Sequence, residues 1–364
     1  MNLELNRAWH RFLLSFERRP LPAPHPAIIT RHHPYADLPM RIVITGGAGF
    51  LGSRLARKIL ERGALTDARG VSRPVRELVL LDVAVPPDLG DPRVRGVAGD
   101  LADPAVIERT VTKDTDTVFH LAAVVSGQAE ADFDIGMRVN LDATRLLLER
   151  CRRLAVPPKF VFTSSLAVFG GPLPDPVGDD APVTPQASYG TQKAIGELLV
   201  YDMTRKDFID GRSLRLPTVT VRPGKPNKAA SSFASSIIRE PLSGVDAICP
   251  VARKTRMWVT SPRAVLENLI IGHEAPASAF AHTRSVNVPG LLVPVDDMVA
   301  ALRRVAGDAV ADRVKWQFDA AIDRIVSTWP ANFAPKFGPA LGMKSDSDFE
   351  SIVRAYIADD MPKG

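Results

Sequence analysis

The sequence predicts an α/β fold, with helices covering both faces of a doubly wound, parallel β-sheet. First, a β-branched apolar run at 42–44 is followed by three spaced glycines and then by a helical pattern. Second, further apolar runs at 77–82, 117–123 and 159–165 alternate with amphipathic stretches. Such regular alternation is typical of a parallel sheet with helices on each face.

Length and composition indicate ordinary globular material, enough for two compact lobes. Of the 364 residues, 45% are hydrophobic and 24% are charged, and the net charge of +5 comes with no dense Lys/Arg block. We therefore expect no nucleic-acid partner. No apolar run approaches the roughly 18 residues of a membrane span. Cys151 and Cys249 fit neither a metal site nor a disulfide framework. We expect a metal-free protein of the reducing cytoplasm.

Residues 1–39 differ from the rest in composition, because prolines recur after Arg19 and would interrupt any regular element. Four of the seven histidines lie here: His10, His25, His32 and His33. A metal-binding tract is one interpretation, but we favour a disordered or spurious leader. Met40 directly precedes the first strand, so we expect it to be the natural start or residues 1–39 to be dispensable. Loss of cofactor binding by a chain beginning at Met40 would contradict this.

The glycines after the first strand are spaced as in a dinucleotide fingerprint. Gly46 permits the tight turn, Gly49 lets the backbone approach a pyrophosphate, and Gly52 lets the helix lie close to the strand. The N-terminus of the following helix offers free N–H groups and a positive dipole end to phosphates. The alternative is a strand-to-helix turn that binds no ligand.

Acidic residues end the next two predicted strands. Asp82 ends the strand at 77–82, where a carboxylate can bind the adenine ribose hydroxyls. The interval from the glycines exceeds the usual ~20 residues, and we expect 64–76 to form a loop that absorbs the excess. No Arg or Lys directly follows Asp82, which favours NAD over NADP. Asp100 ends a further strand. His120, inside the apolar fourth strand, is interpreted as a structural histidine rather than a catalytic one.

The catalytic prediction combines three residues. Ser165 ends the fifth strand, and the carboxyl ends of such strands form the ligand crevice. Tyr189 and Lys193 share one face of a predicted helix because they are four residues apart. A free phenol has a pKa near ~10, and a neighbouring ammonium lowers that pKa because it favours the phenolate. Taken alone, the pair is a common accident of an amphipathic helix, but its place after Ser165 makes it specific.

At this point the chain resembles the extended short-chain dehydrogenase/reductases, in particular the NAD-dependent epimerase/dehydratase group. The resemblance rests on Thr45–Gly52, 120–123, 163–165 and the Tyr189/Lys193 pair, and it covers the chain from Met40 nearly to its end. It implies a Rossmann domain at 40–222, completed by parts of 255–290, with a mainly substrate-binding lobe at 223–364. It also implies that Ser165, Tyr189 and Lys193 are catalytic, that Tyr189 and Lys193 contact the cofactor too, and that the NAD site includes Gly46, Gly49, Phe50, Leu51, Asp82, Asp100, Leu101, Ala122, Ser126, Asn140 and Pro223.

The substrate is less sharply indicated. Sugar-nucleotide dehydratases of this family carry an Asp-Glu pair where this chain has Leu166 and Ala167. The segments 210–240 and 258–262 are similar to the D-erythronate dehydrogenases, which implies oxidation of C2 of a four-carbon sugar acid. A small hydroxy acid needs hydroxyl and amide partners and a cation for its carboxylate. Candidate contacts are Ser126, Ser165, Tyr189, Asn227, Ser231, Ser232 and Arg239, with Arg222, Lys225, Lys228 and Arg256 as rival cations.

The predicted reaction transfers a hydride from C2 to NAD while Tyr189 removes the hydroxyl proton, Lys193 lowers the pKa of Tyr189, and Ser165 orients the oxygen. Two alternatives stay open: a nucleotide-sugar 4-epimerase, which shows no net NADH, and a non-catalytic NAD(P)-binding regulator. The family suggests a homodimer built on helices such as 140–149 and 189–205. Towards the C-terminus we expect helices at 263–272, 295–305, 319–327 and 348–358 and a strand at 285–288.

Overall fold

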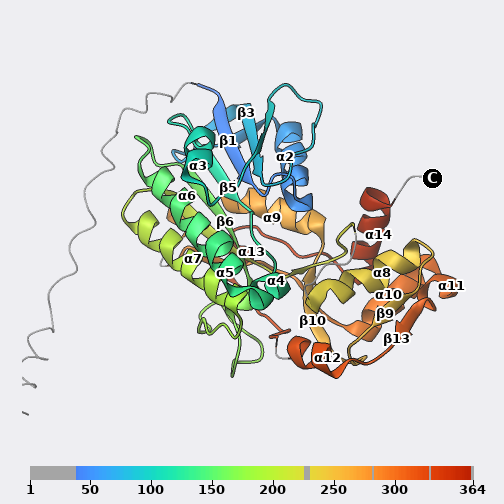
Figure 1. Cartoon of the computed structure of the whole chain (residues 1–364). Helices are drawn as coiled ribbons and strands as arrows, with labels where there is room; N and C mark the ends of the chain where they lie inside the picture. The colour runs from blue at the N-terminus through green and yellow to red at the C-terminus, as the bar shows by residue number, and fades with distance from the viewer. Residues whose placement is uncertain (1–37, 225–229, 281–282, 328, 362–364) are drawn as a thin grey trace, which may run out of the picture. The chain divides into compact units, whose positions relative to one another are not determined.

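A computed structural model describes residues 38–224, 230–280, 283–327 and 329–361. The described residues belong to one compact unit, Leu38–Gly364. All elements below belong to this unit (Figure 1). The predicted leader at 1–39, and the metal-binding alternative to it, lie almost wholly outside the described residues.

The core of this unit is a parallel sheet with the strand order β4-β3-β1-β5-β6-β7-β11. A short strand β2 (Ala64–Thr66) pairs antiparallel with the start of β3. The order runs outward in both directions from β1, so the doubly wound fold predicted from the sequence is confirmed, with its switch point at β1 and β5. The parallel strands are β1 (Met40–Thr45), β3 (Ser72–Asp82), β4 (Val94–Ala98), β5 (Thr117–His120), β6 (Lys159–Ser165), β7 (Asp210–Leu216) and β11 (Ser285–Asn287).

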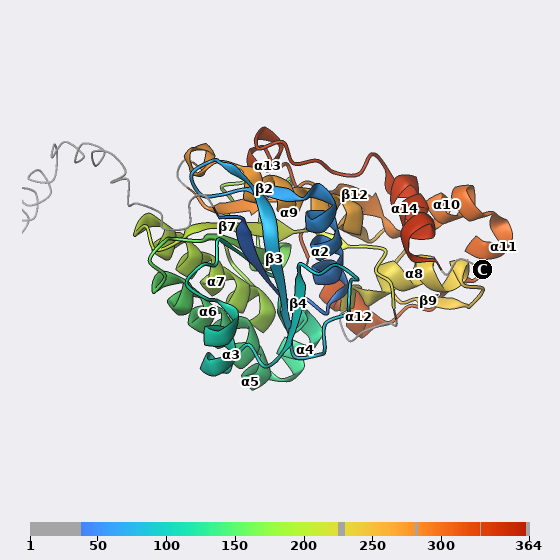
Figure 2. The ribbon, with the colours of Figure 1, turned by 90° about the horizontal axis from the view of Figure 1, so that it is seen from above.

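Helices cover both faces of this sheet (Figures 1 and 2). One face carries α2 (Phe50–Arg62) and α9 (Pro262–Glu274), and the other carries α3 (Pro104–Thr110), α6 (Ala143–Arg152) and α7 (Ser188–Arg205). Successive side chains of a strand point to opposite faces. Ile42 and Ile44 of β1 therefore pack with α2, whereas Val43 packs on the α6 and α7 side. Burial on both faces explains why these strands are continuously apolar.

A second core lies in a smaller C-terminal lobe, built around Ile237, Met298 and Ile352. In the sequence, α9 and β11 lie between segments of this lobe, but α9 packs on the main sheet and β11 is one of its strands. α13 (Phe337–Ala340) also contacts β11. The chain therefore passes between the lobes several times. The lobe contains β8 (Thr218–Val219), β9 (Ala247–Cys249), β10 (Arg256–Thr260), β12 (Leu291–Pro294), β13 (Val314–Trp316), α8 (Phe233–Leu242), α10 (Val295–Ala306), α11 (Asp308–Ala311), α12 (Ala320–Val326) and α14 (Phe349–Asp360).

One local prediction was wrong, and another was confirmed with a different start. The stretch 64–76 is a β2–β3 hairpin rather than a loop, because Arg73 is buried and paired with Asp116 at 2.7 Å. The helix expected at 140–149 begins as a π-helical segment, η1 (Met137–Asp142), before α6. Several other helices were not predicted, among them the short helices α4 (Ser126–Ala131), α5 (Phe133–Gly136) and η4 (Ala277–Ala279).

Candidate active site

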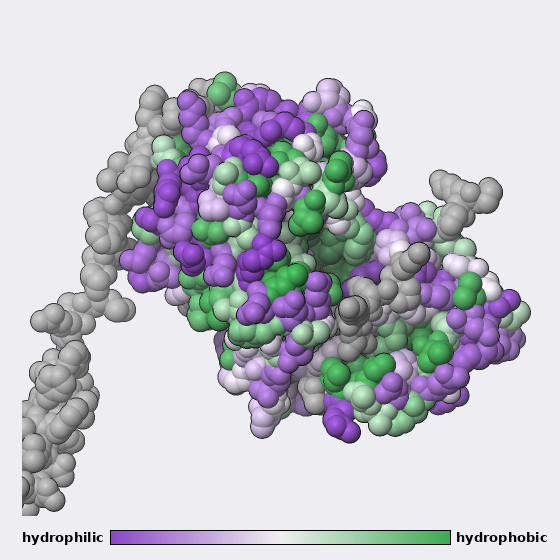
Figure 3. All heavy atoms as spheres, in the orientation of Figure 1, coloured by the Kyte–Doolittle hydropathy of each residue, from purple (hydrophilic) through white to green (hydrophobic). Residues whose placement is uncertain are grey.

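A cleft of about 2570 Å³ opens at the carboxyl ends of the parallel strands and extends to the C-terminal lobe. Figure 3 shows the surface hollowed between the two lobes. Most of the sequence-predicted site residues line this cleft: Gly46, Gly49, Phe50, Leu51, Asp82, Asp100, Leu101, Ala122, Ser126, Ser165, Tyr189, Lys193, Pro223, Ser231, Ser232 and Arg239.

The glycine turn between β1 and α2 has the geometry that a dinucleotide needs. Gly46 has a φ of +73°, and a Cβ there would lie 2.9 Å from the Ala122 backbone nitrogen. A Cβ on Gly52 would lie 2.1 Å from the Gly46 carbonyl oxygen, so only glycine lets α2 sit this close. No side chain caps the N-terminus of α2. Its first turn, Phe50 to Gly52, lines the cleft, and its uncapped N–H groups are of the kind that a pyrophosphate would need.

Two carboxylates follow along the same wall. Asp82 accepts hydrogen bonds from the backbone nitrogens of Ala48, at 3.0 Å, and Ala84, at 3.3 Å. It therefore ties the glycine turn to the end of β3. Asp100 accepts from the Ala102 backbone at 2.8 Å and from Arg138 at 2.5 Å, and both hydrogen bonds lower its pKa. Both carboxylates lie where the ribose end of a dinucleotide is expected.

Ser165 and Tyr189 are brought together by a close helix contact. Ser165 ends β6 and caps the short 3₁₀-helix η2 (Leu166–Val168), accepting from the Ala167 nitrogen at 3.1 Å. α7 begins at Ser188, and a Cβ on Gly190 would lie 2.0 Å from the Ala167 carbonyl oxygen. Only glycine at position 190 lets the first turn of α7 reach η2. The Tyr189 hydroxyl then lies close enough to Ser165 for that side chain to lower its pKa.

Lys193 lies one turn further along α7 and is buried. Its Nζ donates to the Thr163 carbonyl at 2.8 Å and lies 5.7 Å from the centroid of the Tyr189 ring. Burial lowers the pKa of Lys193 to about 7, although the carboxylate of Glu197 raises it. Burial raises the pKa of Tyr189 to about 12, opposed by the Ser165 hydrogen bond and the charge of Arg222. The three predicted catalytic residues therefore lie in mutual reach, with both titrating groups shifted towards their neutral forms.

His120 is a structural residue, as its place in an apolar strand predicts. It is fully buried, with Nδ1 2.7 Å from Thr45 Oγ1 and Nε2 2.8 Å from Thr144 Oγ1. Burial, and secondarily the charge of Lys193, lowers the pKa of His120 to about 3. A buried, neutral imidazole with both nitrogens hydrogen-bonded is not available to exchange a proton with a substrate.

Asn140 departs from its expected position, because it lies behind the cleft wall instead of lining it. Its side chain bonds both backbone groups of Val124, at 2.9 and 3.2 Å, and donates to Gln192 Oε1 at 2.8 Å. Asn140 lies in η1, and such π-helical segments often occur at functional sites. Its role in this structure is to hold the loop after β5 against α7.

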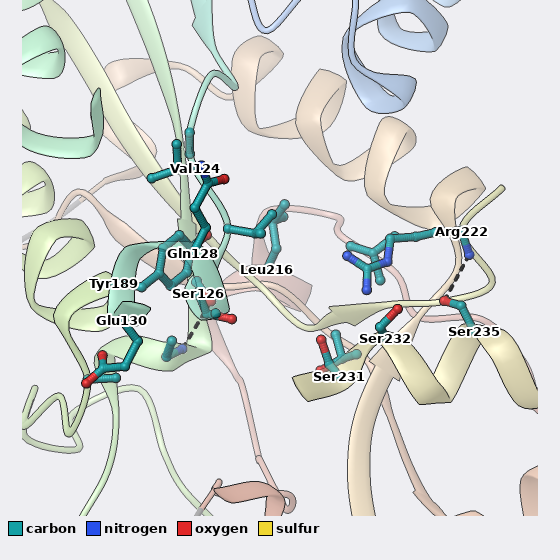
Figure 4. Close-up of a pocket in the computed structure, with 18 of the residues that line it drawn as sticks. Val124, Ser126, Gln128, Glu130, Tyr189, Leu216, Arg222, Ser231, Ser232 and Ser235 are labelled. Carbon is teal, nitrogen blue, oxygen red and sulfur yellow. Dashed lines mark hydrogen bonds between the residues drawn. The ribbon is translucent and has the colours of Figure 1, made fainter. Parts of the chain in front are cut away.

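The substrate side of the cleft differs from the prediction in its cation. Figure 4 shows Arg222, Ser231 and Ser232 across the cleft from Tyr189 and Ser126. The Arg239 guanidinium donates to the Arg222 carbonyl at 2.7 Å and to Glu240 at 2.6 Å, so it is already engaged. The Arg222 guanidinium has no hydrogen-bond partner among the residues that the structure describes. Asn227, Lys225 and Lys228 lie outside those residues, and Arg256 pairs with Asp175 at 3.0 Å.

Sequence reasoning missed two contributors to the site. Glu130, at the end of α4, accepts from the Ser188 nitrogen at 2.9 Å and so supports the N-terminus of α7. Gln128 also lines the cleft near Tyr189 (Figure 4). Both residues belong to the short helix that was not predicted, and no motif marks them.

No cluster of three or more His, Cys, Asp or Glu side chains within the described ranges is arranged to hold a metal ion. In the same part of the chain, no helix is both long and apolar enough to cross a membrane.

Comparison with known proteins identifies the family. The NAD dependent epimerase/dehydratase family matches residues 42–259. D-erythronate dehydrogenase of Cupriavidus necator is 58% identical over 321 residues, which are 88% of this chain and 98% of that protein. D-erythronate dehydrogenase of Haemophilus influenzae is 45% identical over 324 residues, covering 88% of this chain and 100% of that protein.

Solved structures agree on the fold. A nucleoside-diphosphate-sugar epimerase from Agrobacterium tumefaciens is 42% identical with a TM-score of 0.83, covering 88% of this chain and 94% of that one. L-threonine dehydrogenase from Phytophthora infestans is 23% identical with a TM-score of 0.75, covering 87% of this chain and 98% of that one. At that identity the second likeness concerns the fold alone. The chain therefore belongs to the NAD-dependent epimerase/dehydratase family, with NAD as the cofactor that its glycine turn and Asp82 predict.

Proposed function

We propose that this protein is an NAD-dependent dehydrogenase that oxidises the C2 hydroxyl of D-erythronate to 2-oxo-tetronate. The observation that carries the proposal is the pairing, across one cleft, of Tyr189 and Ser165 with the guanidinium of Arg222. A hydroxyl to be deprotonated and a carboxylate to be bound are the two features that such a site recognises in a small hydroxy acid. The names of the two D-erythronate dehydrogenase relatives give the same substrate.

In the proposed reaction, Tyr189 is the general base that removes the C2 hydroxyl proton. Ser165 donates a hydrogen bond to the reacting oxygen and holds it in line with Tyr189. Lys193, in its ammonium form, favours the Tyr189 phenolate and binds the nicotinamide ribose. NAD, when bound, supplies the hydride acceptor. Gly46, Gly49 and Asp82 bind its pyrophosphate and adenine ribose.

We assign the substrate carboxylate to Arg222 instead of Arg239. A guanidinium can bind a carboxylate through two parallel hydrogen bonds, and Arg222 has its donors available on the cleft side. Ser231 and Ser232 lie beside it, directly before α8. The N-terminus of α8 adds a favourable dipole for an anion. Ser126 lies on the Tyr189 side and is suited to a further substrate hydroxyl.

The competing function is nucleotide-sugar 4-epimerisation, which the name of the Agrobacterium tumefaciens relative supports. An epimerase would use the same Tyr189, Lys193 and Ser165, but it returns its hydride. A non-catalytic NAD(P)-binding regulator has less support, because a redox sensor has no need for an assembled Ser165–Tyr189–Lys193 set.

We further propose a cytoplasmic homodimer. Leu198 and Tyr201, three residues apart on α7, have 67% and 41% of their surface exposed, and Phe133 on α5 has 60%. Such exposed apolar side chains on neighbouring helices suit a helical subunit interface. Cys151 and Cys249 are unpaired and buried, which suits a reducing compartment.

The test is NADH formation by the purified protein with NAD and a panel of D-erythronate, L-threonate and longer aldonates. UDP-sugars are tested in parallel for interconversion. Rapid NADH formation with D-erythronate, and little with the others, is the expected result. If no acid gave NADH and a UDP-sugar were interconverted without net NADH, the protein would be an epimerase instead of a dehydrogenase.

A further inference from the structure

Glu197 lies one helical turn beyond Lys193 on α7, so Tyr189, Lys193 and Glu197 are spaced four residues apart on one face. Its carboxylate is buried and accepts hydrogen bonds from three elements of the main sheet. Arg215 of β7 donates through Nε at 3.0 Å and Nη2 at 2.7 Å, and Ser285 of β11 donates at 3.0 Å. Ser164 of β6 donates as well.

This network is joined directly to the catalytic set. Ser164 stands between Thr163, whose carbonyl accepts from Lys193, and Ser165, whose side chain lowers the pKa of Tyr189. Movement of Glu197 would therefore shift the end of β6 that holds both catalytic partners. The mechanism above uses neither Glu197 nor Arg215.

The charges around Lys193 single out Glu197. On α7, Tyr189 lies one turn before it and Glu197 one turn after it. From β5, His120 faces it as a neutral ring, and from β6 it receives only the Thr163 carbonyl and the Phe162 ring, 4.6 Å from Nζ. Among the described residues, Glu197 is the carboxylate that favours the ammonium form of Lys193.

Two cations lie near this set. Arg215, on β7, is bound in a bidentate pair to Glu197, and the influences on the Lys193 pKa are burial and the charge of Glu197. Arg222 lies on the cleft side and acts on Tyr189, where its charge favours the phenolate.

We propose that Glu197 is a positioning residue, which keeps Lys193 in its ammonium form beneath Tyr189 and, through Ser164 and Arg215, fixes α7 to the strand that carries Ser165. The inference rests on the proposed function in one respect: Lys193 must assist Tyr189 as a general base. The identity of the sugar acid does not enter it.

The test uses a double variant, Glu197→Gln with Arg215→Met, because replacing both members of a buried pair by neutral groups of similar size is tolerated better than leaving one charge alone. Formation of the Tyr189 phenolate is followed by ultraviolet difference absorbance in the NAD complex. The Tyr189→Phe protein supplies the background from the other tyrosines. We expect the double variant to bind NAD and to form the phenolate about one pH unit higher than the unmodified protein, which corresponds to a roughly tenfold lower rate near neutral pH.

Two controls separate charge from packing. Glu197→Asp keeps the charge, so its phenolate titration should stay near that of the unmodified protein. Ser285→Ala removes one hydrogen bond to Glu197 without changing any charge, and should likewise leave the titration in place. The proposal is overturned if the Tyr189 phenolate forms at the same pH in the double variant as in the unmodified protein. It is also overturned if Glu197→Asp raises that pH as far as the double variant does.

This titration needs no substrate, so it reports on Glu197 even if D-erythronate proves not to be oxidised. If the unmodified protein formed no NADH with any sugar acid, that result would count against the proposed function but not against the role of Glu197.

Discussion

At the scale of single residues, burial works against the charges that the proposed chemistry needs. It raises the pKa of Tyr189 to about 12 and lowers that of Lys193 to about 7. General base catalysis requires the reverse, a phenolate beside an ammonium. The positive charge that NAD brings when bound, together with Arg222 and Glu197, supplies the favourable electrostatics. If the proposed roles hold, Tyr189 and Lys193 should reach these charge states more readily in the NAD complex than in the free protein.

The Tyr189→Phe variant tests the base. Phenylalanine keeps the ring and its packing but removes the hydroxyl, so NAD should still bind. Turnover should fall by about 10²–10⁴-fold, the usual contribution of a general base. The measurement is kcat for NADH formation beside NAD affinity from fluorescence titration. Near-normal turnover would remove Tyr189 from this role.

The Arg222→Met variant tests the carboxylate site. Loss of a charge-assisted hydrogen bond costs about 1.5–3 kcal/mol, so KM for D-erythronate should rise by roughly 10–100-fold with little change in NAD affinity. Arg239→Met is the matched control. It should chiefly lower the melting temperature, because Arg239 binds Glu240 and the Arg222 carbonyl. A rise in KM with Arg239→Met alone would restore Arg239 as the substrate cation.

At the scale of elements, the site depends on direct backbone packing of the first turn of α7 against η2, with no side chain between the two helices. Gly190 lets the first turn of α7 lie against η2, just as Gly52 lets α2 lie against the glycine turn. The dinucleotide motif marks Gly52 in the sequence. Gly190 has no such signal, because the carbonyl that it must approach, that of Ala167, lies across a long proline-rich loop.

The Gly190→Ala variant tests this contact. The added methyl group would meet the Ala167 carbonyl at 2.0 Å, so α7 must shift away from Ser165. We expect kcat to fall at least tenfold while NAD binding survives, because the glycine turn is untouched. Gly178→Ala is the control, since a Cβ there meets nothing within 4 Å and Gly178 needs no positive φ. Equal kcat in the two variants would contradict the assigned contact.

Much of this arrangement follows from local patterns. β6 at Lys159–Ser165 was predicted with its exact bounds, and the start of α7 was predicted within one residue, because apolar runs and helical spacing are local properties. The choice between Arg222 and Arg239 is not local, since it depends on hydrogen bonds that form only once α8 packs. The β2–β3 hairpin could not be predicted from the local sequence for the same reason. Arg73 of β3 is buried only because it pairs with Asp116, which is distant in the sequence.

At the scale of the whole molecule, two fully buried histidines make the free energy of unfolding depend on pH. Burial lowers the pKa of His120 to about 3 and that of His273 to about 4. Below the ordinary histidine pKa of about 6.5, the unfolded chain binds protons that the folded chain excludes. The stability that these residues contribute is therefore complete above that pH and is lost as the pH falls towards 4 and 3.

The free energy of unfolding should fall by about 1.4 kcal/mol per pH unit for each histidine below pH ~6.5. Urea unfolding between neutral pH and pH ~5 measures the slope. The His120→Gln variant should be less stable overall but should show a shallower slope, because one protonation site is gone. Parallel slopes for the two proteins would show that His120 does not contribute.

The order of segments along the chain has a consequence for how this protein can change its specificity. Because α9 and β11 return to the main sheet between segments of the C-terminal lobe, that lobe is not a continuous stretch of sequence. It cannot be exchanged as a single cassette by recombination with a related gene. On the proposed assignment, new substrates would instead be acquired by point substitutions around α8 and Arg222, while the hydride chemistry on the opposite wall stays intact.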